Sequence, residues 1–233
     1  MGKVDDHRAA LAELEEWMPY LTAHSALPGP RGNLELVAAC GEEADLSRAE
    51  ALVATDDEFA TVCGLVALGR LLGEGDDRHV ETLHAHASDE RWRVREGVAM
   101  ALQRAGDDDP ERAFAVAEQW AVDPDPLVRR GAVAAVCEPR LLRERTFARR
   151  ALKIVEQATA SIEAVPPSER RSPSVRTLRQ ALGYGWSVAV VALPTEGLDA
   201  FRQLCESTDP DLQWIARENS KKNRLKPLLQ PSR

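Results

Sequence analysis

The sequence predicts an all-α fold in which about five helical hairpins stack as an α-solenoid after extra N-terminal helices. Similar segments recur along the chain at intervals of 32 to 47 residues. Apolar residues within these segments follow the period of a helix, and the chain has no alternating β-branched run of note. Apolar residues make up 44% of the 233 residues, which is enough to bury a core.

One apolar residue anchors each repeat and opens its second half. The two clearest copies start at Val94 and Val128, and each continues with apolar residues four, seven and eight positions later. These positions form one stripe on a helix, as expected for a helix that faces a core. The other anchors are Val62, Val175 and Leu212.

Turn residues divide each repeat into two helices. An acidic or Pro-containing segment precedes every anchor, where Asp or Ser caps the next helix and Pro fits its first turn. The predicted first helices are 46–54, 78–87, 110–122, 141–162 and 195–207, and the predicted second helices are 58–72, 90–105, 125–137, 173–192 and 211–226. Residues 5–23 and 34–40 are expected to add helices before the array.

The whole chain, residues 1–233, is expected to form a single repeat domain. Residues 1–33 comprise a first helix and the linker LPGPRGN, residues 34–226 the array, and residues 227–233 a tail. An insertion loop at 163–174, EAVPPSERRSPS, lengthens one repeat. The polar segment that begins at Asn219 is expected to form a solvent-facing cap of the array.

The segment DPDPLVRRGA at residues 123–132 resembles the inter-helix turn of HEAT repeats. In that family the Val packs inward and the next Arg bridges neighbouring repeats, which implies structural roles for Arg95 and Arg129. The resemblance covers roughly residues 46–226 and implies a right-handed solenoid whose second helices line a concave face. It says little about activity, because solenoids carry many functions.

Charge is distributed unevenly between the predicted helices. The second helices carry fourteen basic and six acidic residues, a balance of +8 that leaves −16 on the rest of the chain. A basic concave face would attract an anionic partner even though the net charge of the chain is −8. Structural Arg residues in HEAT turns and acidic helix starts also produce such a skew without any partner. The residues expected to bind are Trp92, Arg130, Arg176, Arg179, Tyr184, Trp186, Trp214, Arg217 and Lys221.

A second interpretation is enzymatic. Trp92 and Glu96 lie four residues apart, Arg130 follows in the next repeat, and Tyr184 and Trp186 follow later. This pattern is similar to that of the HEAT-like alkylpurine DNA glycosylases of DNA alkylation repair, although that family has Asp where Glu96 stands and Trp where Tyr184 stands. The resemblance implies that Trp92 and Tyr184 or Trp186 enclose a cationic damaged nucleotide. It implies a catalytic Glu96 that stabilises the sugar cation, and a phosphate held by Arg130.

The sequence indicates no cofactor and no metal site. It has no glycine-rich phosphate loop, no nucleophile elbow and no Cys or His pair with metal-ligand spacing. The cysteines, which stand apart in separate helical segments as in a reduced cytoplasmic protein, are Cys40, Cys63, Cys137 and Cys205. No apolar signal core or membrane-spanning run is evident, so no membrane association is expected.

The sequence therefore predicts a cytoplasmic HEAT-repeat interaction module without catalytic activity. Its basic concave face is expected to bind a protein or nucleic acid with an acidic surface, duplex DNA included. The alternative is a DNA glycosylase that excises alkylated purines. The oligomeric state is not indicated.

Overall fold

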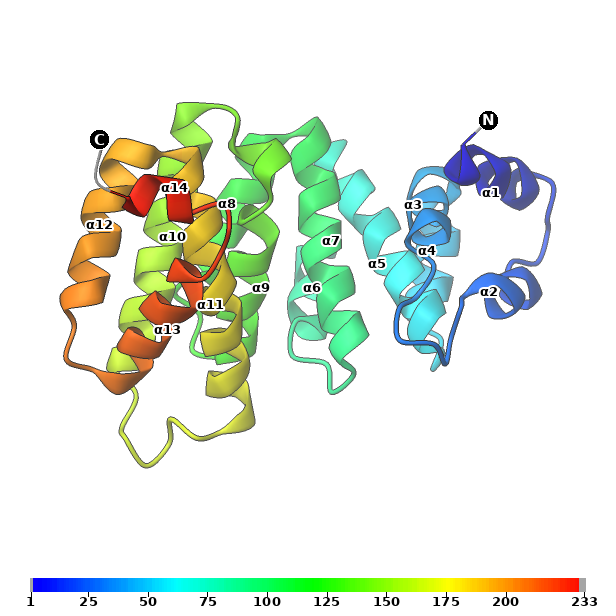
Figure 1. The fold of residues 1–233 in the computed structure, drawn as a ribbon. Coiled ribbons are helices and arrows are strands. Elements are labelled where there is room, and N and C mark those ends of the chain that lie inside the picture. The colour runs from blue at the N-terminus through cyan, green and yellow to red at the C-terminus, as the bar shows by residue number, and fades with distance from the viewer. Residues whose placement is uncertain (1, 231–233) are drawn as a thin grey trace. The chain divides into compact units, whose positions relative to one another are not determined.

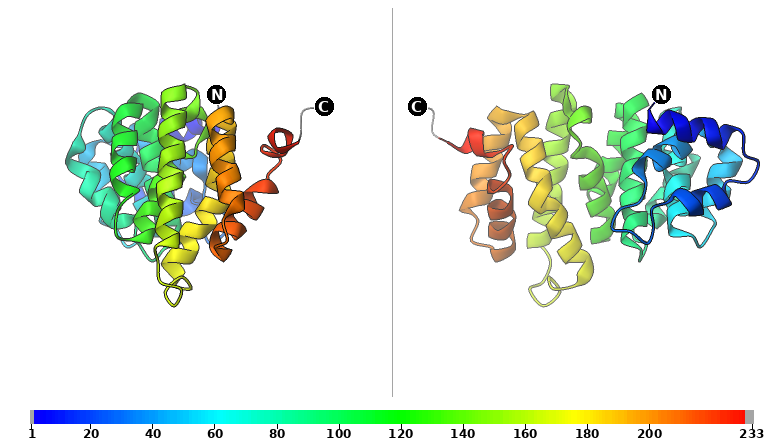
Figure 2. Two further views of the ribbon diagram at one scale, coloured as in Figure 1. Left: turned by 90° about the vertical axis from the view of Figure 1, so that its left-hand side faces the viewer. Right: turned by 45° about the vertical axis from the view of Figure 1, so that its right-hand side comes forward.

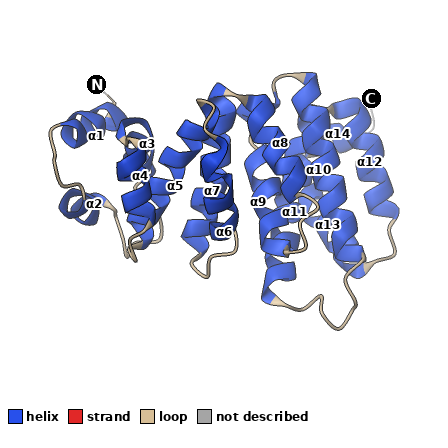
Figure 3. Ribbon diagram, turned by 180° about the vertical axis from the view of Figure 1, so that it is seen from behind, coloured by secondary structure: helices blue, strands red, loops and turns tan. Residues whose placement is uncertain are grey.

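The computed structural model describes residues 2–230, and in that range it contains only helices and the segments that connect them (Figure 3). The predicted all-α fold class is therefore confirmed. The helices, labelled in Figure 1, are α1 (Lys3–Ala12), α2 (Met18–His24), α3 (Leu34–Glu43), α4 (Leu46–Val53), α5 (Glu58–Gly73), η1 (Asp77–His79), α6 (Val80–His86), α7 (Trp92–Asp108), α8 (Pro110–Trp120), α9 (Pro126–Val136), η2 (Pro139–Leu142), α10 (Arg145–Glu163), α11 (Pro173–Ala192), α12 (Pro194–Glu206), α13 (Pro210–Ser220) and α14 (Lys226–Leu229).

Helix starts lie close to the predicted positions because the capping residues act as expected. Asp45, Asp57, Asp125 and Asp209 each accept a hydrogen bond from a backbone N–H in the first turn of α4, α5, α9 and α13. Proline opens α9, α11 and α13, where its missing N–H removes no intrahelical bond. Local chemistry thus accounts for the starts of these five helices.

The predicted helix at 5–23 is two helices, α1 and α2. Between them the Trp17 indole Nε1–H donates to the Leu11 carbonyl at 3.0 Å, and Pro19 lies in the first turn of α2. Trp17 is 5% exposed, so the break buries an aromatic side chain against unit 1. The period of the apolar residues did not indicate this break.

The chain divides by its internal contacts into two compact units, Met1–Ala113 (unit 1) and Phe114–Arg233 (unit 2). In unit 1, α3, α5 and α7 pack side by side, with α1 on α3, α4 on α5 and α6 on α7. In unit 2, α9, α11 and α13 form one layer, called here the second-helix layer, against which α10 and α12 pack (Figure 1). The sequence did not predict this division, because the repeat pattern continues across the boundary.

Close helix approach in unit 1 depends on Gly69. A Cβ atom there would lie 2.2 Å from the Ala101 carbonyl oxygen, so only glycine lets α5 meet α7 at this depth. Cys40 of α3 and Cys63 of α5 are both buried in this core, where burial and the neighbouring Cys40 raise the pKa of the Cys63 thiol. All four cysteines are free, and burial raises the pKa of the Cys137 thiol to about 12.

Asn219 is a buried link between α13 and α11 and not part of a solvent-facing cap. Its side chain is 0% exposed. Its Oδ1 accepts from the Ser187 backbone N–H at 2.8 Å, and its Nδ2 donates to the carbonyls of Leu182 and Ile215, both at 2.8 Å. The predicted cap is wrong at this residue because a fully bonded amide can be buried at low cost.

The insertion loop predicted at 163–174 connects α10 and α11, and it projects past the ends of the neighbouring helices of unit 2 (Figure 2). Backbone turns stabilise it, with the Glu169 N–H on the Pro166 carbonyl and the Ser172 N–H on the Glu169 carbonyl. The predicted tail at 227–233 overlaps α14, and residues 231–233 lie outside the described part of the chain. Within residues 2–230 no helix is both long and apolar enough to cross a membrane.

We expect the Asn219→Leu substitution to lower the free energy of unfolding by about 2–4 kcal/mol, because it removes three hydrogen bonds at a fully buried position. Chemical denaturation followed by circular dichroism measures this change. Asn223→Leu is the matched control, since Asn223 is exposed, and its effect should stay within about 0.5 kcal/mol. Equal effects of the two substitutions would contradict the linking role of Asn219.

Candidate functional site

The two units differ strongly in charge. Unit 1 has 11 basic and 24 acidic residues, a formal net charge of −13. Unit 2 has 19 basic and 14 acidic residues, a formal net charge of +5. The predicted second helices carry five basic and three acidic residues in unit 1, and nine basic and three acidic residues in unit 2, so most of their expected basic balance lies in unit 2.

Ion pairs use most of the arginines on the second helices of unit 1. Arg70 pairs with Glu74, Arg93 with Glu58 at 3.0 Å, and Arg104 with Glu42 at 2.7 Å. Arg91 likewise pairs with Asp89 at 2.8 Å. These bases stabilise the packing of unit 1 and are not presented to a partner.

Unit 2 contrasts with unit 1, because many of its basic residues have no acidic partner. We call these residues the unpaired basic set: they lie on the second-helix layer and its flanking segments and form no ion pair among the described residues. The set consists of Arg129 on α9, Arg171 before α11, Arg176 on α11, Arg217 on α13, and Lys222, Arg224 and Lys226 after α13. The basic region thus extends beyond α9 and α11 to Arg171, Arg217 and the segment from Lys222 to Lys226.

Helix α11 carries a row of exposed side chains at helical spacing. Arg176, Gln180 and Tyr184 are all exposed and lie four residues apart. Tyr184 is 43% exposed, and the Arg224 guanidinium lies 4.7 Å from its ring centroid and donates to its hydroxyl at 2.7 Å. Over its 20 residues α11 has no acidic residue, so this row meets no negative charge from its own helix.

Two of the predicted binding residues are buried, and the expectation that they are open to a partner is wrong. Trp186 is 3% exposed, and its Nε1–H donates to the Thr159 hydroxyl at 2.9 Å inside unit 2. Arg130 is 9% exposed and interacts with other groups of the protein. Both lie on the core side of their helices.

Other predicted binding residues are occupied by partners within unit 2. Arg179 pairs with Asp211 and lies 4.5 Å from the centroid of the Trp214 ring. Trp214 in turn packs against Gly183, where a Cβ atom would lie 3.0 Å from the indole. Lys221 pairs with Glu218 at 2.5 Å. Of the predicted basic residues, Arg176 and Arg217 are therefore exposed and without an ion-pair partner among residues 2–230.

A polar cavity of about 690 Å³ lies where the 164–172 loop meets α11 and α13. Arg170 closes one side of it: its Nε donates to the Val165 carbonyl at 2.8 Å, its Nη2 to the Glu163 carbonyl at 2.7 Å, and its Nη1 to Asp209. Burial alone would raise the pKa of Asp209, but the bonds from Arg170 and from backbone N–H groups hold it below its usual value. Arg171 was not among the residues predicted to bind, although the Arg170–Arg171 doublet was a signal for it.

Unit 1 has a mainly apolar cavity of about 330 Å³, in which Trp92 and Glu96 both take part. Trp92 is 50% exposed, and the cavity continues over Leu34, Phe59 and Met100. The Arg93 guanidinium lies 4.6 Å from the Trp92 ring centroid and is held there by Glu58. One face of this indole thus already has a cation against it. The other residues of the enzymatic interpretation, Arg130, Tyr184 and Trp186, belong to unit 2.

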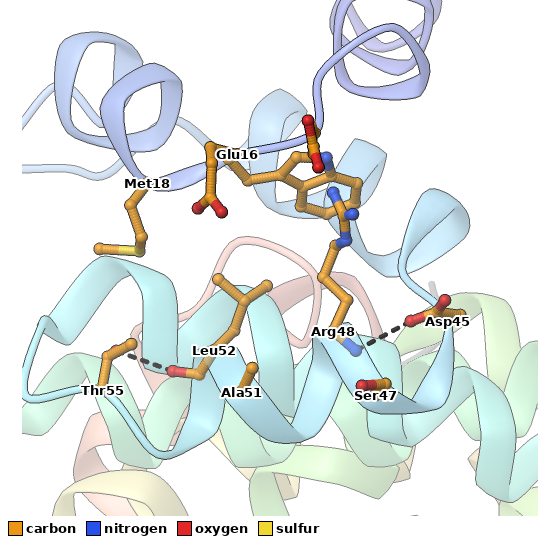
Figure 4. Close-up of a pocket in the computed structure, with 10 residues that line it drawn as sticks. Glu16, Met18, Asp45, Ser47, Arg48, Ala51, Leu52 and Thr55 are labelled. Atoms are coloured by element: carbon orange, nitrogen blue, oxygen red, sulfur yellow. Dashed lines mark hydrogen bonds between the residues drawn. The ribbon is translucent and has the colours of Figure 1, made fainter.

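A further hollow of about 350 Å³ lies between the α1–α2 connection and α4. Glu16 and Met18 lie on one side of it, across from Arg48 and Leu52 on α4 (Figure 4). Arg48 lies 4.5 Å from the centroid of the Trp17 ring, so a cation of the protein already covers this indole. Among residues 2–230 no group of three or more His, Cys, Asp or Glu residues is placed to hold a metal ion.

Comparison with known families gives one match, the family model described as HEAT repeats, over residues 49–137. Residues 49–137 are therefore similar to HEAT repeats. A search of curated proteins finds no match. One solved structure, the crystal structure of an engineered protein, is similar over 98% of this chain and 99% of its own, at 16% identity and a TM-score of 0.38.

The Arg residues of the inter-helix turns form hydrogen bonds that differ from those expected. Arg95 donates to the carbonyls of its own turn, Asp89 at 2.5 Å and Glu90 at 3.0 Å. Arg91 and Arg93 make the bonds to the preceding HEAT repeat, on the Asp56 carbonyl and the Glu58 carboxylate. Arg129 has no hydrogen bond among the described residues, and its Nε is buried without a partner. The predicted bridging role of Arg129 is therefore wrong, and this base belongs to the unpaired basic set.

We expect the Asp209→Asn substitution to release the 164–172 loop, since the amide keeps the helix cap but loses the ion pair with Arg170. Cleavage at Glu169 by a glutamate-specific protease should become faster. In the wild type the lowered pKa of Asp209 means that the pair is complete above the unfolded value of about 3.9 and is lost as the pH falls further. Protection of the loop should decline in that acidic range.

Asp199→Asn is the matched control, because Asp199 forms an exposed ion pair with Arg202 on α12. This substitution should leave cleavage at Glu169 unchanged. If the two variants are cleaved at the same rate as the wild type, the ion pair does not hold the loop.

Proposed function

We propose that this protein is a non-catalytic interaction module that binds an anionic partner through the second-helix layer of unit 2. The match to HEAT repeats over residues 49–137 supports a helical-repeat interaction module. The observation that carries the proposal is the unpaired basic set, which lies in a unit of net charge +5 while unit 1 has −13. The partner is a protein or a nucleic acid with an acidic surface, and duplex DNA belongs to that class.

The physical reason is that an ion-paired base has little attraction left for a ligand, whereas an unpaired one keeps its full charge. Arg176 and Arg217 are exposed on adjacent helices of the layer, and Arg129 lies on the third. Charges of one sign on a low-dielectric surface add, so they raise the local concentration of an anionic partner. We place the module in the cytoplasm, in keeping with four free cysteines.

We expect the double variant Arg176→Ala/Arg217→Ala to weaken binding to labelled duplex DNA or to polyglutamate in fluorescence anisotropy. With DNA, each phosphate contact that is lost should flatten the dependence of log affinity on log salt by about 0.9. Neither residue has an ion-pair partner in the described structure, so the thermal midpoint should stay close to that of the wild type.

The matched control is Arg145→Ala/Arg149→Ala, which removes the same charge from α10 in the other layer of unit 2. A similar loss of affinity in both double variants would assign binding to net charge and not to the second-helix layer. No binding of either polymer at low salt by the wild type would refute the proposed function.

A DNA glycosylase of the alkylation-repair type is the second candidate. It is favoured by one observation, the shared cavity of Trp92 and Glu96, where the carboxylate is near an exposed indole. The Arg93 cation against Trp92 weighs against it, because it weakens the attraction of that ring for a cationic base.

We expect Glu96→Gln to change nothing in binding assays. If the protein releases 7-methylguanine or 3-methyladenine from alkylated DNA, and Glu96→Gln abolishes this release while DNA affinity stays the same, the enzymatic candidate replaces the first. Base release is measured by chromatography of the supernatant after incubation with methylated duplex DNA.

A further inference from the structure

We propose that the cavity beside the 164–172 loop binds a backbone phosphate of a single-stranded nucleic acid, and that Tyr184 stacks on one of its bases. The inference rests on the proposed function and specifies the chemistry of the partner. Three observations carry it: the local charge balance of the cavity, the exposed row on α11, and the aromatic side chain at the end of that row.

The cavity is positively charged at its opening. Its four arginines are Arg170, Arg171, Arg176 and Arg179, and its two acids are Asp209 and Asp211. Both acids are already neutralised, Asp209 by Arg170 and Asp211 by Arg179. Arg171 and Arg176 remain, both exposed and without an ion-pair partner among residues 2–230. The lining thus has a surplus of two positive charges, which suits an anionic oxygen group such as a phosphate.

The loop keeps Arg171 at this position. Arg170 fixes the loop to the start of α13, and Ser172 N–H donates to the Glu169 carbonyl at 3.0 Å just after Arg171. The N-terminal end of α11 at Pro173 follows directly, and its partial positive charge adds to the attraction for an anion. An anion between Arg171 and Arg176 would therefore meet two guanidinium groups from a loop held in place.

The exposed row on α11 indicates the direction in which a single nucleic-acid strand would run. Arg176 and Tyr184 are eight residues apart, which is about 12 Å along a helix. That length matches about three stacked nucleotides at 3.4 Å each. Gln180 is exposed between them, and its amide can both donate to and accept from the edge of a base.

The aromatic side chain favours a single strand over a duplex or a phosphorylated peptide. Tyr184 is exposed, and Arg224 and Lys222 lie 4.7 and 5.8 Å from its ring centroid. Both cations lie over the ring, so a neutral base would stack on the part of Tyr184 that remains exposed while the cations hold the backbone. Base faces are hidden in a duplex, and a phosphopeptide would use the cavity but not Tyr184.

The test uses the full-length protein and fluorescein-labelled oligo(dT) and oligo(U) of 20 nucleotides, with affinity measured by anisotropy at several salt concentrations. Arg171→Ala/Arg176→Ala should flatten the log–log salt dependence by about 1.4, which is two contacts at about 0.7 each for single strands. Tyr184→Leu should weaken binding by at least fivefold without changing that slope. Arg145→Ala/Arg149→Ala is again the control of equal charge.

Several outcomes would overturn the inference. The first is a salt dependence that changes equally in the Arg171/Arg176 and Arg145/Arg149 variants. The second is an unchanged affinity in Tyr184→Leu, and the third is tighter binding of a duplex or of a phosphothreonine peptide than of the single strand. If oligonucleotides bind but these variants behave as the wild type, the phosphate site is wrong and the proposed function stands. If neither oligonucleotides nor polyglutamate bind at low salt, the proposed function itself fails.

Discussion

The ion pair between Arg170 and Asp209 is the interaction on which the charged surface of unit 2 depends. Asp209 caps α13 through its Oδ1 and receives Arg170 on its other oxygen, so one carboxylate fixes both a helix start and a loop. Asp209 is ionised at neutral pH because Arg170 and the backbone N–H groups lower its pKa against the effect of burial. With this acid neutralised, Arg171 and Arg176 determine the sign of the charge at the cavity opening. Without Asp209, Arg170 would keep only Asp211, at 3.7 Å, as a carboxylate partner, and the 164–172 loop would lose its main side-chain anchor.

Asn219 has a comparable role inside the layer. It joins α13 to α11 at the level of Ser187, and the same part of α11 carries Tyr184 on its exposed side. Gly183, beside Tyr184, makes room for Trp214 of α13, which Arg179 covers. These contacts between α11 and α13 fix the spacing of the two helices and so hold the exposed row of α11 in place. A binding surface on such a layer is preorganised, so little binding free energy is lost in ordering it.

Arginines on the second helices have different roles in the two units. In unit 1, Arg104 and Arg93 of α7 reach carboxylates of other helices, Glu42 and Glu58. These pairs are partly buried and stabilise the stacking of the repeats. In unit 2 the corresponding helix α11 has two arginines and no acid, and only Arg179 finds a carboxylate. The difference in net charge between the units thus appears at the surface as a difference in which bases remain available.

The sequence by itself determined the fold class, the approximate bounds of the helical hairpins and the place of the long loop. These features are local: Asp209 caps a helix next to it in the chain, and Pro173 starts one. Only the tertiary structure decided which charged and polar groups are available. Arg130 and Arg129 are adjacent, yet one is buried and engaged while the other has no partner, and Asn219 is buried where a solvent-exposed cap was expected. The physical reason is that the ion pair of Arg104 with Glu42 and the hydrogen bond of Asn219 with Ser187 each join residues more than thirty positions apart. Helical spacing specifies which face of a helix is buried, but it does not specify which groups pack against that face.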